Sequence, residues 1–311
     1  MTSHVAVLSG GTSMEREVSL RSGRRVADAL GDRGYRVSNL DVDARLVRTL
    51  DEGGFDLAFL ALHGSAGEDG TIQSLLELLE LPYTGPDVLA SSLAWNKPIA
   101  QGLYRRAGIA VPDHVVLTQQ AFREMGAAAA VDRVAAELGS PLVVKPATGG
   151  SSLGLSVVEE PERLGQAILG AFSYAEAVLV ERFVSGTEVA VTLLDGEPLP
   201  AVEIRPKEGA YDFAARYTAG ATEFHAPARI TDEVAAACAQ AATTAYAAVG
   251  ARHVSRADLI IDADGVPWLL ELDTCPGLTE TSLVPMAAQA AGLAFEDLCE
   301  RLVRLALKEA T

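Results

Sequence analysis

Short apolar segments alternate with helical patterns through the first 90 or so residues. Residues 5–8 and 55–61 are apolar runs of strand length, residues 35–41 form another strand-like segment, and residues 18–33 have the spacing of an amphipathic helix. This strand–helix–strand order predicts a parallel sheet, whose ligands lie beyond the carboxyl ends of its strands. Loops of unusual sequence lie at those ends, after the first and third strands.

The rest of the chain divides into two further units. The second is predicted to contain a helix at 92–108, a strand at 142–144 and a glycine-rich loop at 148–154. The third is predicted to contain strands at 178–180 and 188–194, a polar loop at 205–227, a long alanine-rich helix and a final hairpin. We therefore predict three domains, at residues 1–91, 92–180 and 181–311.

The final hairpin, between residues 256 and 277, consists of two apolar strands with acidic residues at matching ends. Asp258 enters the first strand, and Glu271 and Asp273 leave the second two residues apart, on one face of the pleat. Three carboxylates converging beside Arg256 would repel one another unless a divalent cation held them, and oxygen ligands favour Mg²⁺ or Mn²⁺ over zinc. The alternative is a surface hairpin with acidic ends.

Composition narrows the class of protein. The chain has 311 residues, about half of them apolar, and a formal net charge of −17, which argues against a nucleic-acid partner held by a general basic field. Its three cysteines have no metal-ligand or disulfide-framework spacing, which fits a reducing compartment. With no signal peptide and no apolar run approaching 18 residues, we expect a cytoplasmic protein without a membrane partner.

A glycine-rich loop follows the strand that ends at Lys145. Small residues allow backbone amides to approach phosphate oxygens, and the lysine adds a positive charge, so this segment together with Lys97 is a candidate phosphate site. No Walker A pattern and no GxGxxG loop occurs. Glu181 and Glu188, on either side of a turn, could accept hydrogen bonds from an adenine amine or ribose hydroxyls. A strand-end lysine and exposed turn acids are the plainer alternatives.

Seven segments, in order along nearly the whole chain, resemble the D-alanine–D-alanine ligases of the ATP-grasp superfamily. They are Gly-Gly-Thr-Ser-Met-Glu15 with Val18-Ser19-Leu20, His63-Gly-Ser-Ala-Gly-Glu68-Asp69-Gly70 with Gln73, Pro82-Tyr83-Thr84-Gly85, Val144-Lys145-Pro146 with Gly150-Ser151-Ser152, Tyr211-Asp212 with Tyr217, Arg256-Ala-Asp258, and Glu271-Leu-Asp273-Thr-Cys-Pro-Gly277 with Ser282-Leu283-Val284-Pro285.

The resemblance implies an α/β fold with a three-domain ATP-grasp architecture. Its N-terminal domain would be a Rossmann-like parallel sheet that binds substrate, its central domain would carry the phosphate loop, and its C-terminal domain would carry a lid loop and the magnesium site. The implied reaction is ATP-dependent ligation of two D-alanines through a D-alanyl phosphate, for peptidoglycan precursors. ATP, two Mg²⁺ or Mn²⁺ ions and a homodimer are also implied.

The resemblance further implies a role for each site residue. Those for catalysis are Glu15, Ser151, Tyr217, Arg256 and Gly277. Those for ATP are Lys97, Lys145, Ser152, Glu181, Glu188 and Arg216. Those for the amino-acid substrates are Glu15, His63, Arg256, Ser282 and Leu283. Those for the metal are Asp258, Glu271 and Asp273.

Two positions depart from the usual family pattern. Arg216 stands in the lid where lysine is common, and Asp273 stands where asparagine is common. Arginine keeps the charge in a larger, planar group, and the added carboxylate should tighten cation binding. We expect an active enzyme; a different second D-amino acid, in antibiotic biosynthesis or self-resistance, is the alternative use. A nucleotide-binding regulator without turnover is the alternative from another class.

Overall fold

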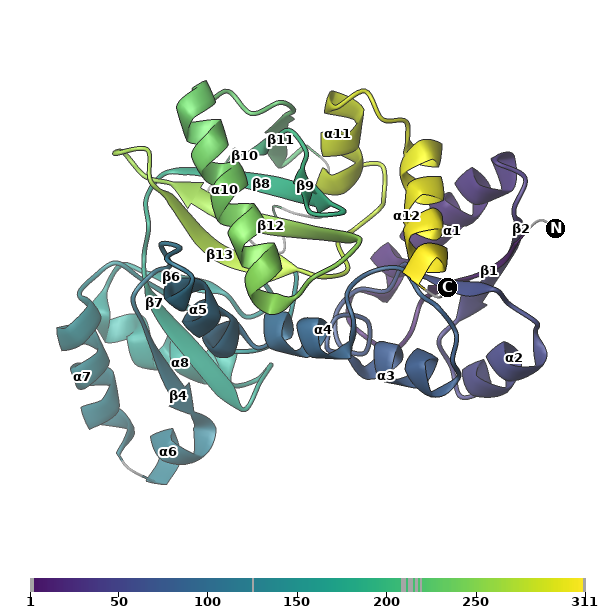
Figure 1. The fold of residues 1–311 in the computed structure, drawn as a ribbon. Helices are drawn as coiled ribbons and strands as arrows, with labels where there is room; N and C mark the ends of the chain where they lie inside the picture. The colour runs from purple at the N-terminus through teal and green to yellow at the C-terminus, as the bar shows by residue number, and fades with distance from the viewer. Residues whose placement is uncertain are drawn as a thin grey trace.

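Three β-sheets, each with its own helices, make up the molecule (Figure 1). The computed structural model describes residues 3–124, 126–207, 211, 215, 218 and 220–309. Within those residues no helix is long and apolar enough to cross a bilayer. Arg216 and Tyr217, two of the predicted site residues, lie outside the described part of the chain.

The first sheet is parallel, as the strand–helix alternation predicts. Its strands β1 (His4–Ser9), β2 (Arg36–Asp41) and β3 (Leu57–Leu60) run in the order β2-β1-β3. Helix α1 (Arg16–Asp32) packs on one face, and helices α2 (Leu46–Glu52) and α3 (Thr71–Leu78) pack on the other. The loops after β1 and β3 therefore open at the same edge of the sheet.

The second sheet is antiparallel, in the order β4-β7-β5-β6. Its strands are β4 (His114–Thr118), β5 (Leu142–Pro146), β6 (Ser156–Val158) and β7 (Ala177–Arg182). Its helical segments are α6 (Gln119–Glu124), α7 (Ala127–Leu138), η1 (Pro161–Arg163) and α8 (Leu164–Ala171). Apolar residues from this sheet and from α6, α7 and α8 form a core of their own. Lys145 lies on β5, near the end of the strand that leads into the glycine-rich loop.

The third sheet is also antiparallel and has the order β11-β10-β8-β12-β13, with β9 paired to β8. Its strands are β8 (Thr187–Leu194), β9 (Glu197–Pro198), β10 (Val202–Pro206), β11 (Thr222–His225), β12 (Val254–Ile261) and β13 (Pro267–Asp273). Helix α10 (Asp232–Val249) packs on one face, and α11 (Leu283–Ala290) packs on the other (Figure 1). The predicted hairpin is β12 and β13.

Two predicted elements were wrong in detail. The single helix expected at 92–108 is two helices, α4 (Val88–Trp95) and α5 (Lys97–Arg106), because Asn96 ends one and caps the other, with its side-chain oxygen accepting from the amide of Ile99 at 3.2 Å. The polar loop expected at 205–227 contains strand β11, which pairs with β10.

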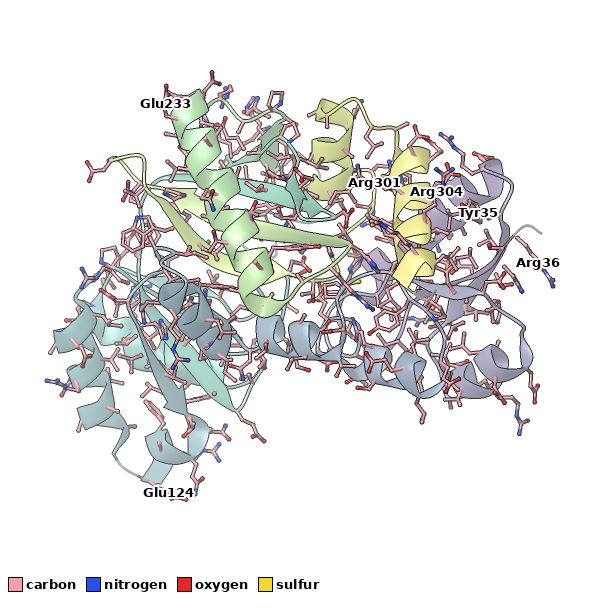
Figure 2. All side chains as sticks on the ribbon, in the orientation of Figure 1. Tyr35, Arg36, Glu124, Glu233, Arg301 and Arg304 are labelled. Atoms are coloured by element: carbon pink, nitrogen blue, oxygen red, sulfur yellow. The ribbon has the colours of Figure 1, made fainter. Side chains whose placement is uncertain are left out.

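Helix α12 (Phe295–Glu309) packs back onto the first sheet, although it is last in the chain. Figure 1 shows it beside α1, and Figure 2 shows its Arg304 close to Tyr35, which precedes β2. The predicted division at residue 180 falls within β7, whose six residues belong to the second sheet. The three domain ranges stay predictions; the packing places 295–309 with the N-terminal core.

Candidate active site

Two adjoining cavities lie between the three sheets, and every predicted site residue that the structure describes lines one or both of them. The first cavity takes in the residues predicted for the amino-acid substrates and for catalysis. These are Glu15, His63, Ser151, Arg256, Gly277, Ser282 and Leu283, together with Asp273. The second takes in those predicted for ATP. These are Lys145, Ser152, Glu181 and Glu188, together with Asp258. Lys97, Glu271, Gly149, Gly150 and Tyr211 line both cavities.

Register brings the charged ends of the hairpin together. Arg256 stands opposite Asp273, and Asp258 stands opposite Glu271, with a β-bulge just after Asp258. Arg256 is buried and contacts both Oδ atoms of Asp258, at 2.6 and 2.8 Å; its Nη1 lies 3.1 Å from Asp273 Oδ2. Although burial alone would lower the pKa of Arg256, Asp258 and Asp273 hold it well above its ordinary value. Burial, by contrast, raises the pKa of Asp273.

The predicted metal ligands are paired with cations in this arrangement. Among the residues that the structure describes, no group of three or more acidic, histidine or cysteine side chains is arranged around a common point for a metal. The sequence argument assumed that only a cation from solution could offset three carboxylates, whereas Arg256 and Lys97 do so here. The donor set, oxygen-only and on adjacent strands, still suits Mg²⁺ or Mn²⁺, so the metal assignment stays a prediction.

Lys97 stands at the wall between the cavities. Its Nζ donates to the carbonyl of Gly149 at 2.5 Å and lies 3.2 Å from Glu271 Oε2. Its backbone amide donates to Ala147, so the start of α5 is tied to the glycine-rich loop. The lysine therefore joins the loop to the hairpin.

Lys145 and Glu181 form a buried ion pair, with 2.7 Å between Nζ and Oε2. Gln101 of α5 donates a hydrogen bond to the other oxygen of Glu181. Glu181 is thus no exposed turn acid, and Lys145 no solvated strand-end lysine, so the plainer alternatives for these two residues do not hold. A buried pair facing a cavity with apolar walls suits recognition of a nucleotide.

Glu15 precedes α1, and Ser151 lies on the glycine-rich loop, 136 residues later. The Ser151 hydroxyl donates to Glu15 Oε1, so the loop of the second sheet meets the loop of the first. Ser151 and Ser152 have left-handed backbone conformations, with φ of 50° and 56°, as does Gly149 with φ of 123°. This turn directs the loop towards both cavities.

Glu68 is a site residue that has no role in the sequence-based predictions. It accepts from the amide of Gly64 at 2.8 Å and faces the first cavity near Glu15, across Gly150. Burial, reinforced by the charges of Asp273 and Glu15, holds the pKa of Glu68 well above its ordinary value. The sequence signal that could have identified Glu68 is its position in the same segment as His63. That segment does not predict that the Glu68 carboxyl faces Glu15.

His63 lines the first cavity, yet both of its ring nitrogens already have partners within the protein. Nε2 lies 3.0 Å from Ser22 Oγ, and Nδ1 lies 3.0 Å from the carbonyl oxygen of Cys275. Burial lowers the pKa of His63, which favours the neutral ring. A direct bond from His63 to a substrate, as predicted, would replace one of these two contacts.

Gly277 and Ser282 lie at opposite ends of a tight turn before α11. A Cβ on Gly277 would stand 2.8 Å from Ser282 Oγ, so no larger residue fits without displacing that hydroxyl. Ser282 is the N-cap position of α11, and Leu283 is its first residue. The partial positive charge of a helix start there suits a carboxylate.

The lid is described only in part. Tyr211 lines both cavities, and its carbonyl oxygen accepts from Ser152 Oγ at 3.3 Å. Arg216 and Tyr217 lie outside the described residues, so their predicted roles stay predictions.

The parallel N-terminal sheet, the two antiparallel sheets and the cavity between them are the architecture of an ATP-grasp protein. Family comparison narrows this class. The model described as "D-ala D-ala ligase C-terminus" matches residues 103–304, and that described as "D-ala D-ala ligase N-terminus" matches residues 46–86. The chain belongs to the D-alanine–D-alanine ligase family.

Individual relatives agree over nearly the full length. A D-alanine–D-alanine ligase of Anaeromyxobacter dehalogenans is 46% identical, covering 96% of this chain and 95% of that protein. One of Pelotomaculum thermopropionicum is 42% identical, covering 99% and 98%. Among solved structures, the D-alanine–D-alanine ligase of Bacillus anthracis matches with a TM-score of 0.87 at 31% identity, covering 99% of both chains. The VanG D-Ala:D-Ser ligase of Enterococcus faecalis matches with a TM-score of 0.84 at 29%, covering 98% and 99%.

Proposed function

We propose that this chain is an ATP-dependent ligase that joins two D-alanines into D-alanyl-D-alanine for peptidoglycan precursors, releasing ADP and phosphate. The observation that carries the proposal is the division of residues between two cavities that meet at Lys97 and Glu271. Nucleotide in one cavity and amino acids in the other would place the γ-phosphate next to a carboxylate. A solved relative, the ligase of Bacillus anthracis, is described as complexed with ATP.

In the first step, a carboxylate oxygen of the first D-alanine attacks the γ-phosphorus, and ADP leaves with the electron pair of the broken phosphorus–oxygen bond. Glu15, oriented by Ser151, would receive the ammonium group of that D-alanine through a charge-assisted hydrogen bond. Lys97 and Lys145 would face the phosphates, where positive charge stabilises the transferring group.

Asp258, Glu271 and Asp273 would hold Mg²⁺ or Mn²⁺, which supplies positive charge to nucleotide phosphates when bound. Those carboxylates now contact Arg256 and Lys97. Both cations would then turn from the carboxylates towards the phosphates as nucleotide binds. Glu271 lines both cavities, which suits a ligand at their boundary.

In the second step, the amine of the second D-alanine, after losing a proton, bonds to the acyl carbon of D-alanyl phosphate. The carbon–oxygen bond to phosphate then breaks, phosphate departs with the electron pair, and the nitrogen loses its second proton. Arg256 and the Gly277 amide would stabilise the oxyanion that forms. Ser282 and the Leu283 amide would hold the carboxylate of the second substrate.

The lid with Arg216 and Tyr217 would exclude water from the acylphosphate. We also propose that the enzyme acts as a homodimer in the cytoplasm, and that residues 1–91, 92–180 and 181–311 contribute the substrate, phosphate-loop and metal parts of the site. The division of the site among the three ranges is supported by the cavities, because residues from the part of the chain around each sheet line them.

D-serine is the second candidate for the acceptor. The structural match to a D-Ala:D-Ser ligase is as close as that to the ATP complex of the Bacillus anthracis enzyme, with TM-scores of 0.84 for both. The two uses differ only in the second substrate, so the first step is common to both.

A product assay tests the proposal. The protein is incubated with ATP, Mg²⁺ and D-alanine, alone or with D-serine, D-lactate or other D-amino acids, and the products are separated by mass. We expect D-alanyl-D-alanine with one ADP per dipeptide, in excess over mixed products at equal acceptor concentrations. An excess of D-alanyl-D-serine would identify D-serine as the acceptor. Absence of any ligated product would refute the proposal.

A further inference from the structure

The segment 274–282, between β13 and α11, contains no helix or strand, yet several of its residues are buried. It carries Gly277 and Ser282, the groups proposed above for the oxyanion and the acceptor carboxylate. Several of its backbone groups bind side chains from the first sheet's part of the molecule. Those partners are Ser22 and Arg25 on α1, and His63 after β3. Residues more than 200 positions earlier in the chain therefore anchor this acceptor loop, the name used below for 274–282.

One anchor is a directed chain of hydrogen bonds. The amide of Leu278 donates to Ser22 Oγ at 3.3 Å, which leaves the Ser22 hydroxyl hydrogen for His63 Nε2, 3.0 Å away. His63 must then carry its ring proton on Nδ1, which donates to the carbonyl of Cys275 at 3.0 Å. The neutral ring satisfies every donor and acceptor in the chain. Ser22 and His63 thus hold the loop on both sides of Gly277.

The second anchor is Arg25, one helical turn after Ser22 on the same face of α1. Its Nη1 donates to the carbonyls of Leu278 and Thr279, both at 2.9 Å. The guanidinium lies 3.7 Å from the ring centroid of Phe295, the first residue of α12. The arginine is therefore itself held in place while it binds two successive peptide carbonyls.

Hydrogen bonds within the loop pass this restraint on to Ser282. The Thr279 amide donates to Ser282 Oγ at 3.0 Å, and Thr279 Oγ1 lies 2.8 Å from the same hydroxyl. The carbonyl of Thr279 also accepts from the Ser282 amide at 3.1 Å. Fixing the Thr279 backbone through Arg25 thereby fixes Ser282.

We propose that Ser22 and Arg25 are positioning residues for the second step of the reaction, holding the acceptor loop so that Gly277 and Ser282 meet the acylphosphate and the second amino acid. This inference rests on the proposed ligase function. Neither side chain belongs to the second cavity, so ATP binding is independent of them. The two residues act on the acceptor half of the site.

A misplaced acceptor loop has a specific chemical consequence. If the amine is not held against the acyl carbon, water attacks D-alanyl phosphate instead, the bond between the acyl group and phosphate breaks, and D-alanine and inorganic phosphate are released. ATP is then consumed without dipeptide. The number of dipeptides formed per ADP therefore reports the position of the loop.

The experiment compares Arg25→Ala, Arg25→Lys and Ser22→Ala with wild type, and uses Arg24→Ala as the matched control. Arg24 is an exposed arginine on the same helix that does not line either cavity. We expect Arg25→Ala and Ser22→Ala to raise KM for the second D-alanine by about tenfold, as loss of a buried hydrogen bond predicts, and to lower the dipeptide-to-ADP ratio. KM for ATP should stay within about twofold, and Arg25→Lys should recover part of the ratio because it keeps a donor.

Hydrogen–deuterium exchange of the ligand-free proteins provides a second readout. Amides of 274–282 should exchange faster in Arg25→Ala and Ser22→Ala than in wild type or Arg24→Ala. If wild type forms no dipeptide, the ligase function fails, whereas the exchange result still decides whether α1 holds the loop. Should Ser22→Ala not fold, the Arg25 variants test the inference without it, since Arg25 is only half-buried. An unchanged product ratio, acceptor KM and loop exchange, with only a lower Tm, would overturn the inference.

Discussion

At the scale of single residues, the site is a set of buried and half-buried charges that neutralise one another. Arg256 pairs with Asp258 and Asp273, Lys97 with Glu271, and Lys145 with Glu181. A buried charge without a partner is costly, so each pair offsets the cost of burying its own charges. Under the proposed function, a phosphate would replace the carboxylate partner of such a cation.

Asp273 should set the metal requirement. In Asp273→Asn the side-chain oxygen can still accept from the Cys275 amide, now at 3.0 Å, so the fold should persist. The loss of one negative ligand should raise the Mg²⁺ concentration for half-maximal ADP formation by about tenfold or less. Asp262→Asn, in the turn of the same hairpin and bonded to the Trp268 indole, is the control. An unchanged Mg²⁺ dependence in Asp273→Asn would show that this carboxylate does not bind metal.

His63 should make stability depend on pH. Burial lowers its pKa below the ordinary value of 6.5, so the unfolded chain binds a proton that the folded protein does not. The stability from the neutral ring is present above pH 6.5 and is lost as the pH falls below it. Between about pH 6.5 and 5.5, wild type should lose roughly 1 kcal/mol more than His63→Gln, measured by urea unfolding. His114→Gln, on β4, is the control, and equal losses in wild type and His63→Gln would contradict the assignment.

The sequence identified the charged residues of the site because their spacing on a hairpin fixes their face, as with Asp258, Glu271 and Asp273. It did not identify their partners. The pairing of Lys97 with Glu271 joins helix α5 to strand β13, and such contacts depend on how the helix packs against the third sheet. For the same reason, the sequence places Ser22 and Arg25 on an amphipathic helix but does not predict their contacts with residues 274–282.

At the scale of elements, the break between α4 and α5 places Lys97, the lysine proposed to face the phosphates, at the start of a helix. Asn96 supplies the cap from which α5 starts, and Lys97 is the first residue of that helix. The Asn-Lys-Pro sequence carried this signal, since an N-cap residue followed by proline marks a helix start. Strand β11 carried no such signal. Among the described residues it pairs with β10 alone, and Phe224 is its single apolar residue.

Removal of the cap should affect both stability and nucleotide binding. Asn96→Ala should lower the free energy of unfolding by about 1 kcal/mol and raise KM for ATP, because Lys97 loses its fixed starting point. Asn96→Ser, which restores a capping oxygen, should resemble wild type in both. The measurements are urea unfolding and initial rates at varied ATP. A normal KM for ATP in a destabilised Asn96→Ala protein would show that the cap stabilises the fold without affecting ATP binding.

At the scale of the whole molecule, the two ends of the chain form one core. Helix α12 packs with α1 on the first sheet, and the acceptor loop lies between that core and the third sheet. An amphipathic pattern predicts that a helix buries one face, but not against which sheet. That is why residues 295–309 were expected to belong with the C-terminal domain.

Leu302→Ala tests this core. The side chain is 1% exposed and packs with residues of α1 and β3. Its truncation should cost about 2–5 kcal/mol by urea unfolding. It should also increase amide exchange in β1 and β3, far from it in sequence. Arg301→Ala, an exposed neighbour labelled in Figure 2, should change neither. Faster exchange confined to α12 would mean that the helix is not part of the N-terminal core.

The central claim is that ligation proceeds through an acylphosphate formed where the two cavities meet. Labelling both carboxylate oxygens of D-alanine with ¹⁸O tests it most directly, because one of those oxygens bonds to the γ-phosphorus and leaves with phosphate. Mass spectrometry of the released phosphate should find one ¹⁸O per dipeptide, while the new peptide carbonyl retains the other. Phosphate without ¹⁸O, released together with D-alanyl-D-alanine, would contradict the account.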